Sequence, residues 1–243
     1  MWITGRRAVA EAIAAGRATE VIIGNWVRRT QGLDAVTRAA RRKGLPVRTA
    51  SKDELDGIGM NHQGVVARVA ASPKGISERE LGGWEFGPAD LVVVLDGITD
   101  PQNLGACARV AEAAGAAMLV TRIRRSAGVS HGAIRASAGA LLHLPVARVT
   151  NLRRSLERLQ DGGFTVIGLD GSAPHSIYEE ACPDGRVAVV VGSEGEGISR
   201  LVRQSCDLLV SIPMRGRVTS LNASAALAAA LFGYVLPSRS HQP

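Results

Sequence analysis

The sequence contains few aromatic residues, few cysteines and no long apolar run. Phe, Trp and Tyr make up 3% of its 243 residues, so a buried core has to be packed by Ala, Val, Leu and Ile. The three cysteines, Cys107, Cys182 and Cys206, include no CxxC pair, which favours a reducing, cytoplasmic location over a disulfide framework. The most apolar run, residues 223–236, is too short to span a bilayer and contains Gly233. We therefore expect no membrane segment and no signal peptide at the N-terminus.

Several common catalytic and metal-binding motifs are also missing. GSEGEG, residues 192–197, has the wrong glycine spacing for a dinucleotide fingerprint and lacks the Lys-Ser/Thr ending of a P-loop. No GxSxG nucleophile elbow occurs. The five histidines show no metal-ligand spacing, so we expect no metal. These absences disfavour a nucleotide oxidoreductase, a P-loop NTPase, a serine hydrolase and a zinc enzyme.

Positive charge is concentrated in the first third of the chain. Residues 1–72 contain 12 Lys and Arg against 6 Asp and Glu, whereas the remainder contains 17 against 16. A basic segment on a near-neutral body predicts a polyanionic partner, most plausibly nucleic acid. A solvated basic surface in an arginine-rich sequence is the alternative. The candidate RNA-binding residues are Arg6, Arg7, Arg28, Arg29, Arg41 and Arg42.

Hydrophobic periodicity divides the chain into two α/β parts. Residues 1–71 alternate short helices and strands, including a helix in SKDELDGI that we expect Ser51 to cap. Residues 72–88 contain Pro and paired Gly without a clear period and are interpreted as a linker. From 89 to 243, continuous apolar strands alternate with helices, which predicts a parallel sheet covered on both faces.

Three polar, glycine-containing loops follow strands of this second part. ITDPQNLGACAR follows VVVLDG, SEGEGIS follows VAVVVG, and RGRVTSLNAS follows LVSIPM. Ligands of such sheets bind at the carboxyl ends of the strands. Three polar loops at one edge therefore predict a single site.

The loops also carry a resemblance. DPQNLGACAR, GSEGEGIS and IPMRGRVTSLNAS resemble the three motifs of the SpoU/TrmH family of RNA 2′-O-ribose methyltransferases, and the resemblance covers the whole chain. GRRAVAEAI, NHQGV and LPVARVTNL resemble the branch that methylates a guanosine of 23S rRNA. The resemblance implies an L30e-like RNA-binding domain, then a SPOUT domain whose C-terminal segment forms a trefoil knot. It further implies S-adenosylmethionine as cofactor, 23S rRNA as substrate and a homodimer.

The motif residues follow from the resemblance position by position. Those it places at the catalytic site are Asn103, Arg109, Glu194, Ser220 and Asn222. Those it places against the cofactor, largely through backbone, are Gly192, Ile212 and Leu221. We expect Gly192 to let backbone approach the ligand closely. We expect Arg109 to stabilise the developing oxyanion and pair with phosphate, because a guanidinium stays protonated and is a poor base.

Each motif residue also has an ordinary structural explanation. Asn103 is a good cap for the helix LGACARVAEAAG, Arg109 fits a solvated helix position, and Glu194 fits a loop charge. Either Ser220 or Asn222 is suited to cap the final, alanine-rich helix, and a cap and a catalytic role are compatible. Three motifs in the right order at three strand ends favour the functional interpretation.

Two alternatives for the function stay open at this point. One keeps the chemistry but changes the target to another rRNA or tRNA nucleotide, including methylation of the antibiotic-resistance type. The other is a non-catalytic RNA-binding or ribosome-assembly protein on the same fold. NASAALAAAL has alanines where the family has branched residues, so packing of the implied knot is expected to differ in detail.

Overall fold

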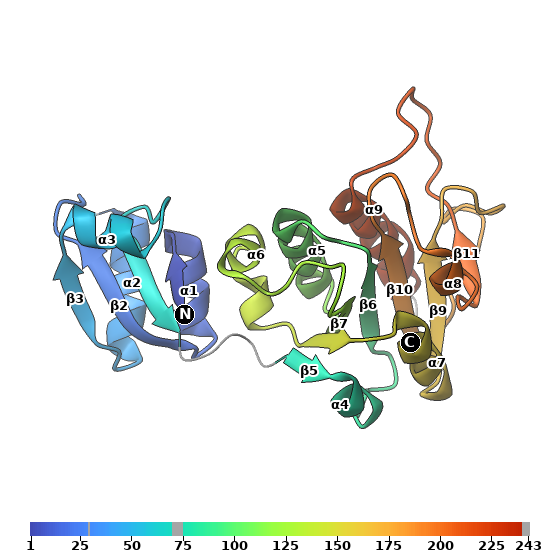
Figure 1. The fold of residues 1–243 in the computed structure, drawn as a ribbon, viewed down its shortest axis with the longest axis horizontal. Coiled ribbons are helices and arrows are strands. Elements are labelled where there is room, and N and C mark those ends of the chain that lie inside the picture. Colours follow the sequence, from blue (N-terminus) through green and yellow to red (C-terminus); the bar gives the residue numbers. More distant parts are fainter. Residues whose placement is uncertain (29, 70–74, 240–243) are drawn as a thin grey trace.

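Two β-sheets organise the chain in the computed structural model, which describes residues 1–28, 30–69 and 75–239 (Figure 1). Arg29, one of the predicted RNA-binding residues, lies outside the described residues. None of the helices in the described ranges is long and apolar enough to cross a membrane.

The first sheet has four strands in the order β1-β4-β2-β3. These are β1 (Trp2–Thr4), β2 (Ala18–Gly24), β3 (Val47–Ala50) and β4 (Val65–Val69). β4 pairs antiparallel with β1 and β2, whereas β2 and β3 are parallel. Three helices accompany them: α1 (Arg6–Ala14), α2 (Gln31–Arg42) and α3 (Lys52–Ile58). Ser51 caps α3 as predicted, because its hydroxyl accepts the Glu54 N–H at 3.3 Å.

The second sheet has seven strands, and every pairing in it is parallel, which confirms the predicted α/β class. Its order is β11-β9-β10-β6-β7-β8-β5. The strands are β5 (Gly75–Ser77), β6 (Leu91–Asp96), β7 (Met118–Arg122), β8 (Val146–Val149), β9 (Phe164–Leu169), β10 (Arg186–Gly192) and β11 (Leu208–Val210).

Helices cover both faces of this sheet, as its continuous apolar strands predict. The helical elements are α4 (Glu78–Gly82), α5 (Pro101–Ala113), α6 (His131–Ala136), η1 (Ala140–Leu142), α7 (Leu152–Asp161), α8 (Arg200–Arg203), α9 (Ala223–Ala230), η2 (Leu231–Val235) and α10 (Leu236–Arg239). Successive β6 side chains alternate between two cores. Val93 packs in the core that contains α5 and α9, and Val94 in the core that contains α7 and α8. The trefoil knot stays a prediction.

Part of the segment interpreted as a linker belongs to the second sheet. β5 pairs with β8, and α4 follows with a capping box between Ser77 and Glu80. Arg158 of α7 holds this segment by donating to the Glu78 carbonyl at 2.9 Å. Of its described residues, 75–88, only Ile76 and Leu81 are buried, so this part carries no hydrophobic period that the sequence pattern could have detected. The boundaries expected at 71/72 and 88/89 stay predictions.

The two sheets meet through α1 and β1 on one side and α6 and η1 on the other. The Thr4 N–H donates to His131 Nε2 at 3.1 Å, and Glu11 pairs with His143 at 3.2 Å. Burial, with a smaller effect of the nearby Arg135 charge, lowers the pKa of His131. The lowered pKa favours the neutral ring, which alone can accept the Thr4 hydrogen bond.

Candidate functional site

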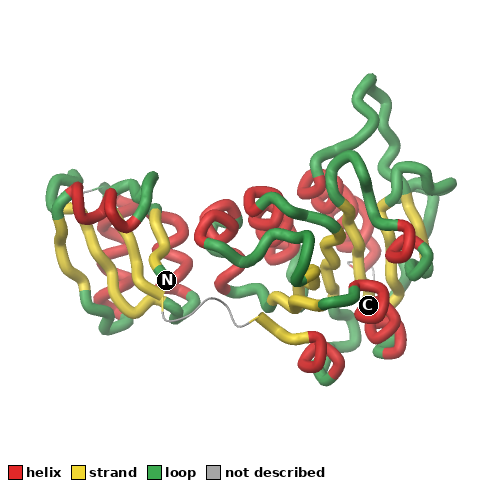
Figure 2. The backbone as a smooth tube through the Cα atoms, viewed as in Figure 1, coloured by secondary structure: helices red, strands yellow, loops and turns green. Residues whose placement is uncertain are grey.

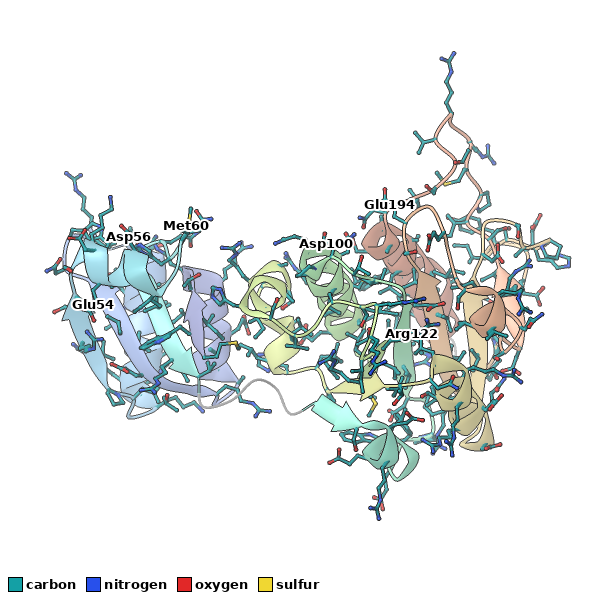
Figure 3. The ribbon with its side chains drawn as sticks, in the orientation of Figure 1. Glu54, Asp56, Met60, Asp100, Arg122 and Glu194 are labelled. Carbon is teal, nitrogen blue, oxygen red and sulfur yellow. The ribbon has the colours of Figure 1, made fainter. Side chains whose placement is uncertain are left out.

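Loops gather at the carboxyl edge of the second sheet (Figure 2). They line a cavity of about 670 Å³. The loops after β9, β10 and β11 line it, together with the start of α9. Five of the eight residues predicted for catalysis or cofactor binding line this cavity: Gly192, Glu194, Ile212, Ser220 and Leu221. Figure 3 shows Glu194 at the same edge as Asp100, which precedes α5. Two of the three predicted motifs thus border one cavity, as the parallel sheet requires.

The loop after β10 folds back tightly on Gly192. A Cβ placed at Gly192 would lie 1.9 Å from the carbonyl carbon of Gly197 and 2.3 Å from the nitrogen of Ile198. The Gly197 N–H donates to the Ser193 carbonyl at 2.9 Å and closes the loop. The chain's own backbone therefore already requires a glycine at this position, and the expected close approach of Gly192 to a ligand stays a prediction. Gly195 is needed for its backbone conformation and not for lack of space, because its φ of +85° is left-handed and the space around it is open.

The first and third motifs meet directly through two side-chain amides. Asn222 Nδ2 donates to Asn103 Oδ1 at 2.9 Å, across 119 positions of sequence. Asn222 Oδ1 accepts the Ser224 N–H at 2.9 Å and so caps α9. Of the two candidates for this cap, Ser220 and Asn222, the cap is therefore Asn222. Because that oxygen must face the Ser224 donors, the amide nitrogen of Asn222 is directed to Asn103. The cap and the contact between motifs use opposite ends of one side chain.

Asp100, and not Asn103, caps α5. Its carboxylate accepts the Gln102 N–H at 3.0 Å, and Pro101 occupies the first helical position. The cap explanation for Asn103 is therefore wrong, and its amide is free to serve the contact with Asn222. Its own Nδ2 and the Ser220 hydroxyl make no hydrogen bond within the described part of the chain.

Arg109 lies elsewhere. It is exposed on α5 and lines a second cavity of about 430 Å³, with Arg7 and Glu11 of α1 and with His143. It is not among the residues that line the first cavity. Within one chain, the fold thus separates the predicted catalytic arginine from the predicted cofactor residues. It places Arg109 beside Arg7, one of the predicted RNA-binding residues.

A buried carboxylate that the sequence interpretation did not single out holds the loop after β10 against the ends of β6 and β7. Asp96, at the end of β6, has a side chain that is 3% exposed. It accepts the Ser199 N–H at 2.7 Å and pairs with Arg122 of β7 at 2.9 Å. Arg122, labelled in Figure 3, also donates to the Ser199 hydroxyl at 3.2 Å. An Asp that ends an otherwise apolar buried strand, in VVVLDG, was the available signal.

The cavity wall is acidic. Asp170, Glu194 and Glu196 all line it. Partial burial acts to raise the pKa of Asp170, but hydrogen bonds from the Ser172 backbone and hydroxyl and from Arg203 outweigh it and hold that pKa below its usual range. Asp170 is therefore ionised at neutral pH and is paired with Arg203. Glu194 and Glu196 form no ion pair within the described part of the chain, so their charge gives the cavity a preference for a ligand that carries positive charge. Among the described residues, no group of three or more His, Cys, Asp or Glu is placed to hold a metal ion.

The predicted RNA-binding arginines differ in their surroundings. Arg28, Arg41 and Arg42 are exposed. Arg6 forms hydrogen bonds within the part of the chain that contains the first sheet, because its guanidinium donates to the Gln63 carbonyl at 3.3 Å and to the Thr30 hydroxyl at 3.0 Å. Its side chain thus helps to join the starts of α1 and α2 to the loop before β4.

Comparisons with known proteins agree with this architecture. The model of the SpoU rRNA Methylase family matches residues 90–232, and that of the RNA 2′-O ribose methyltransferase substrate-binding domain matches residues 2–74. The chain is 43% identical over 237 residues to the "23S rRNA (guanosine-2′-O-)-methyltransferase RlmB" of Xanthomonas axonopodis pv. citri, which covers 95% of this chain and 94% of that one. The protein of the same name from Ralstonia nicotianae is 43% identical over 207 residues, 84% and 82% of the two chains.

Solved structures with the same fold include two at 25% identity. The SpoU methyltransferase AviRb from Streptomyces viridochromogenes, in complex with the cofactor AdoMet, superposes with a TM-score of 0.77 over 99% of this chain and 91% of that one. A structure described as an RNA 2′-O ribose methyltransferase superposes with a TM-score of 0.80 over 99% and 89%.

Proposed function

The chain belongs to the SpoU rRNA methylase family, and from that premise we propose that it transfers the methyl group of S-adenosylmethionine to a ribose 2′-hydroxyl of 23S rRNA, at a guanosine. The observation that carries the proposal is the 43% identity, over 95% of the chain, to a relative that bears this activity in its name. The contact between Asn103 and Asn222 supports it, because it joins two motifs beside the cavity. Such an enzyme works in the cytoplasm, where ribosomal RNA is found in bacteria.

The cavity suits S-adenosylmethionine in size and charge. Its volume of about 670 Å³ falls in the range of roughly 300–1,000 Å³ that is usual for pockets of small ligands. When bound, the cofactor supplies an electrophilic methyl group on a positively charged sulfur. Glu194 and Glu196, which line the cavity and form no ion pair within the described part of the chain, favour that charge. The rest of the cofactor would be held mainly by backbone groups, those of Gly192, Ile212 and Leu221.

The chain's own residues would then have to align a ribose hydroxyl and favour its loss of a proton. The Ser220 hydroxyl and the free Nδ2 of Asn103 are available to hydrogen-bond the ribose. The cap of α9 fixes Asn222, and Asn222 fixes Asn103, so this pair is oriented before RNA binds. Because Arg109 lies apart from this cavity within one chain, it would act from the second copy of the proposed dimer, where it would hold phosphate and stabilise the developing oxyanion with its planar fork of donors.

Residues 1–71 are proposed to form the RNA-binding domain, and 89–243 the catalytic domain. The exposed Arg28, Arg41 and Arg42 support phosphate contacts there. A protein that begins at residue 75, and so retains β5, should keep its cofactor affinity and bind RNA much more weakly. Equal RNA affinity would show instead that the catalytic part alone recognises the substrate.

We also propose a homodimer. The motivation is the family resemblance together with the last helices, which are nearly all apolar and leave Phe232 49% exposed. Sedimentation velocity should report twice the mass of the chain. A stable monomer that still methylates RNA would rule the dimer out.

The decisive experiment maps ribose methylation in rRNA from cells with and without the gene by mass spectrometry. One 2′-O-methylguanosine of 23S rRNA should disappear on deletion and return with the wild-type gene, but not with Asn103→Ala. If 23S rRNA is unchanged and a tRNA or 16S rRNA nucleotide loses its methyl group, the target is wrong. If no nucleotide changes, the enzymatic proposal fails.

A further inference from the structure

The segment between β11 and α9 stands out from the body of the molecule. We call residues 213–221 the strap. All nine are exposed, and Figure 1 shows this orange-red segment projecting beyond the rest of the fold. No backbone hydrogen bond ties its residues to the body among those in the described structure. An exposed segment of this kind beside a site is positioned to meet a substrate.

The strap has two chemically different sides. Met214, Gly216 and Val218 line the first cavity, whereas Arg215 and Arg217, which alternate with them, do not. The strap contains these two arginines and no acidic residue. One side of the strap therefore belongs to the cavity, and the other side carries two cations.

Neither cation is used by the protein itself. Within the described part of the chain, Arg215 and Arg217 form no ion pair and no hydrogen bond. Glu194 and Glu196 border the same cavity, but they do not pair with the strap. A pair of free guanidiniums, each with five donors in a planar fork, matches the oxygens of phosphate groups.

We propose that Arg215 and Arg217 hold the phosphate backbone of the RNA substrate from the outer side of the strap. The inference rests on the proposed function and adds a contact from the catalytic part to those expected from residues 1–71. RNA is the partner that the geometry favours, because the strap ends at Ser220 and Leu221, which line the cavity. A nucleotide that reaches this cavity has its neighbouring phosphates beside the strap.

The test compares two double variants of the full-length chain. Arg215→Ala/Arg217→Ala removes the proposed contacts. Arg79→Ala/Arg154→Ala is the control, because it removes two other exposed arginines, on α4 and α7, which lie at the bottom of Figure 1 while the strap lies at its top. The probe is a 23S rRNA fragment that the wild-type protein methylates. Its affinity is measured at several salt concentrations, and its KM and kcat are measured in parallel.

The strap variant should bind RNA with a shallower salt dependence. Each phosphate contact to a single strand contributes about 0.7 to the slope of log affinity against log salt, so losing two should lower the slope by about 1.4. The KM for RNA should rise far more than kcat falls. Arg215→Lys/Arg217→Lys should recover most of the slope, since lysine keeps the charge. The control should keep the wild-type slope.

Three results would count against the proposal. A wild-type slope and KM in the strap variant would overturn it. So would an equal loss in the control, which would reflect net charge alone. A loss of S-adenosylmethionine affinity as large as the loss of RNA affinity would show that the arginines support the cavity instead. If the wild-type protein itself methylates no 23S rRNA fragment, the proposed function fails, which is a separate outcome.

Discussion

Replacing Gly192 by alanine should disrupt the loop after β10 much more than the same change at Gly195. At Gly192 the new Cβ would begin 1.9 Å from the Gly197 carbonyl carbon and 2.0 Å from its oxygen, whereas real Cβ contacts essentially never fall below 3.0 Å. The Gly197 backbone must therefore retreat by about 1 Å, as the packing of interiors requires. Gly195 is the matched control, because nothing lies within 4 Å of its Cβ position.

The loop cannot retreat freely, because the residues after Gly197 are anchored. Ile198 is 8% exposed and packs in the core on the α7 face. The Ser199 N–H is held by the buried Asp96 at 2.7 Å. Overpacking costs about 1–3 kcal/mol, and disturbing a hydrogen bond to a charged group costs a further 1.5–3 or so. We expect Gly192→Ala to lower the free energy of unfolding by about 3 kcal/mol, on the same two grounds. Gly195→Ala should cost about 1 kcal/mol for its left-handed backbone.

Urea unfolding without ligand measures the first quantity, and calorimetry with S-adenosylmethionine measures its consequence for the site. Gly192→Ala should lose cofactor affinity by a hundredfold or so, more than Gly195→Ala, because the displaced Gly197 itself lines the cavity. If the two variants are equally stable and bind the cofactor equally, the close approach of Gly197 does not constrain Gly192. If Gly192→Ala is fully stable yet binds no cofactor, the glycine serves the ligand directly.

Three further predictions follow from the remaining groups. Asp96→Asn should lower the free energy of unfolding by about 3 kcal/mol, because it breaks a buried pair, and a loss below about 0.5 kcal/mol in urea would contradict the anchoring role. Arg109→Lys should bind cofactor normally and lose methylation rate about a hundredfold in single turnovers, and a rate within about twofold of wild type would remove Arg109 from the mechanism. Burial raises the pKa of Cys107 and of Cys206 from an ordinary value near 9 to about 12. The native state thus keeps protons that the unfolded chain loses above pH 9, so the free energy of unfolding should fall as pH rises from 9 toward 12. The buried Cys107 thiol and the partly buried Cys206 thiol should both resist iodoacetamide at pH 8.5 until urea is added, and fast labelling of the native protein would refute the raised pKa values.

Much of the second sheet is determined by the sequence. In LVVVLD every position but the last is apolar, so both faces of β6 have to be covered, and only a parallel sheet between helices provides that. Parallel strands end at the same edge, so the three polar loops had to meet there, and five of the predicted residues line one cavity. Helix geometry also separates Asn103 from Arg109. Six residues turn a helix by about 600° and advance it by about 9 Å, so the two side chains point in different directions.

Only the tertiary structure decides between residues that are equally suited to a role by their local sequence. Asp100 and Asn103 are both good caps, and only the contact with Asn222 explains why Asn103 lies inside α5. β5 is three residues long and forms because β8 offers it an unpaired edge. Three residues are too few to show a hydrophobic period, so the sequence alone could not indicate this strand. Gly192 is a glycine because the backbone of Gly197 returns to within 2 Å of its Cβ position, a contact between loop residues that depends on Asp96 and Ile198. Periodicity records which face of an element is buried, whereas these features depend on which other segment covers that face.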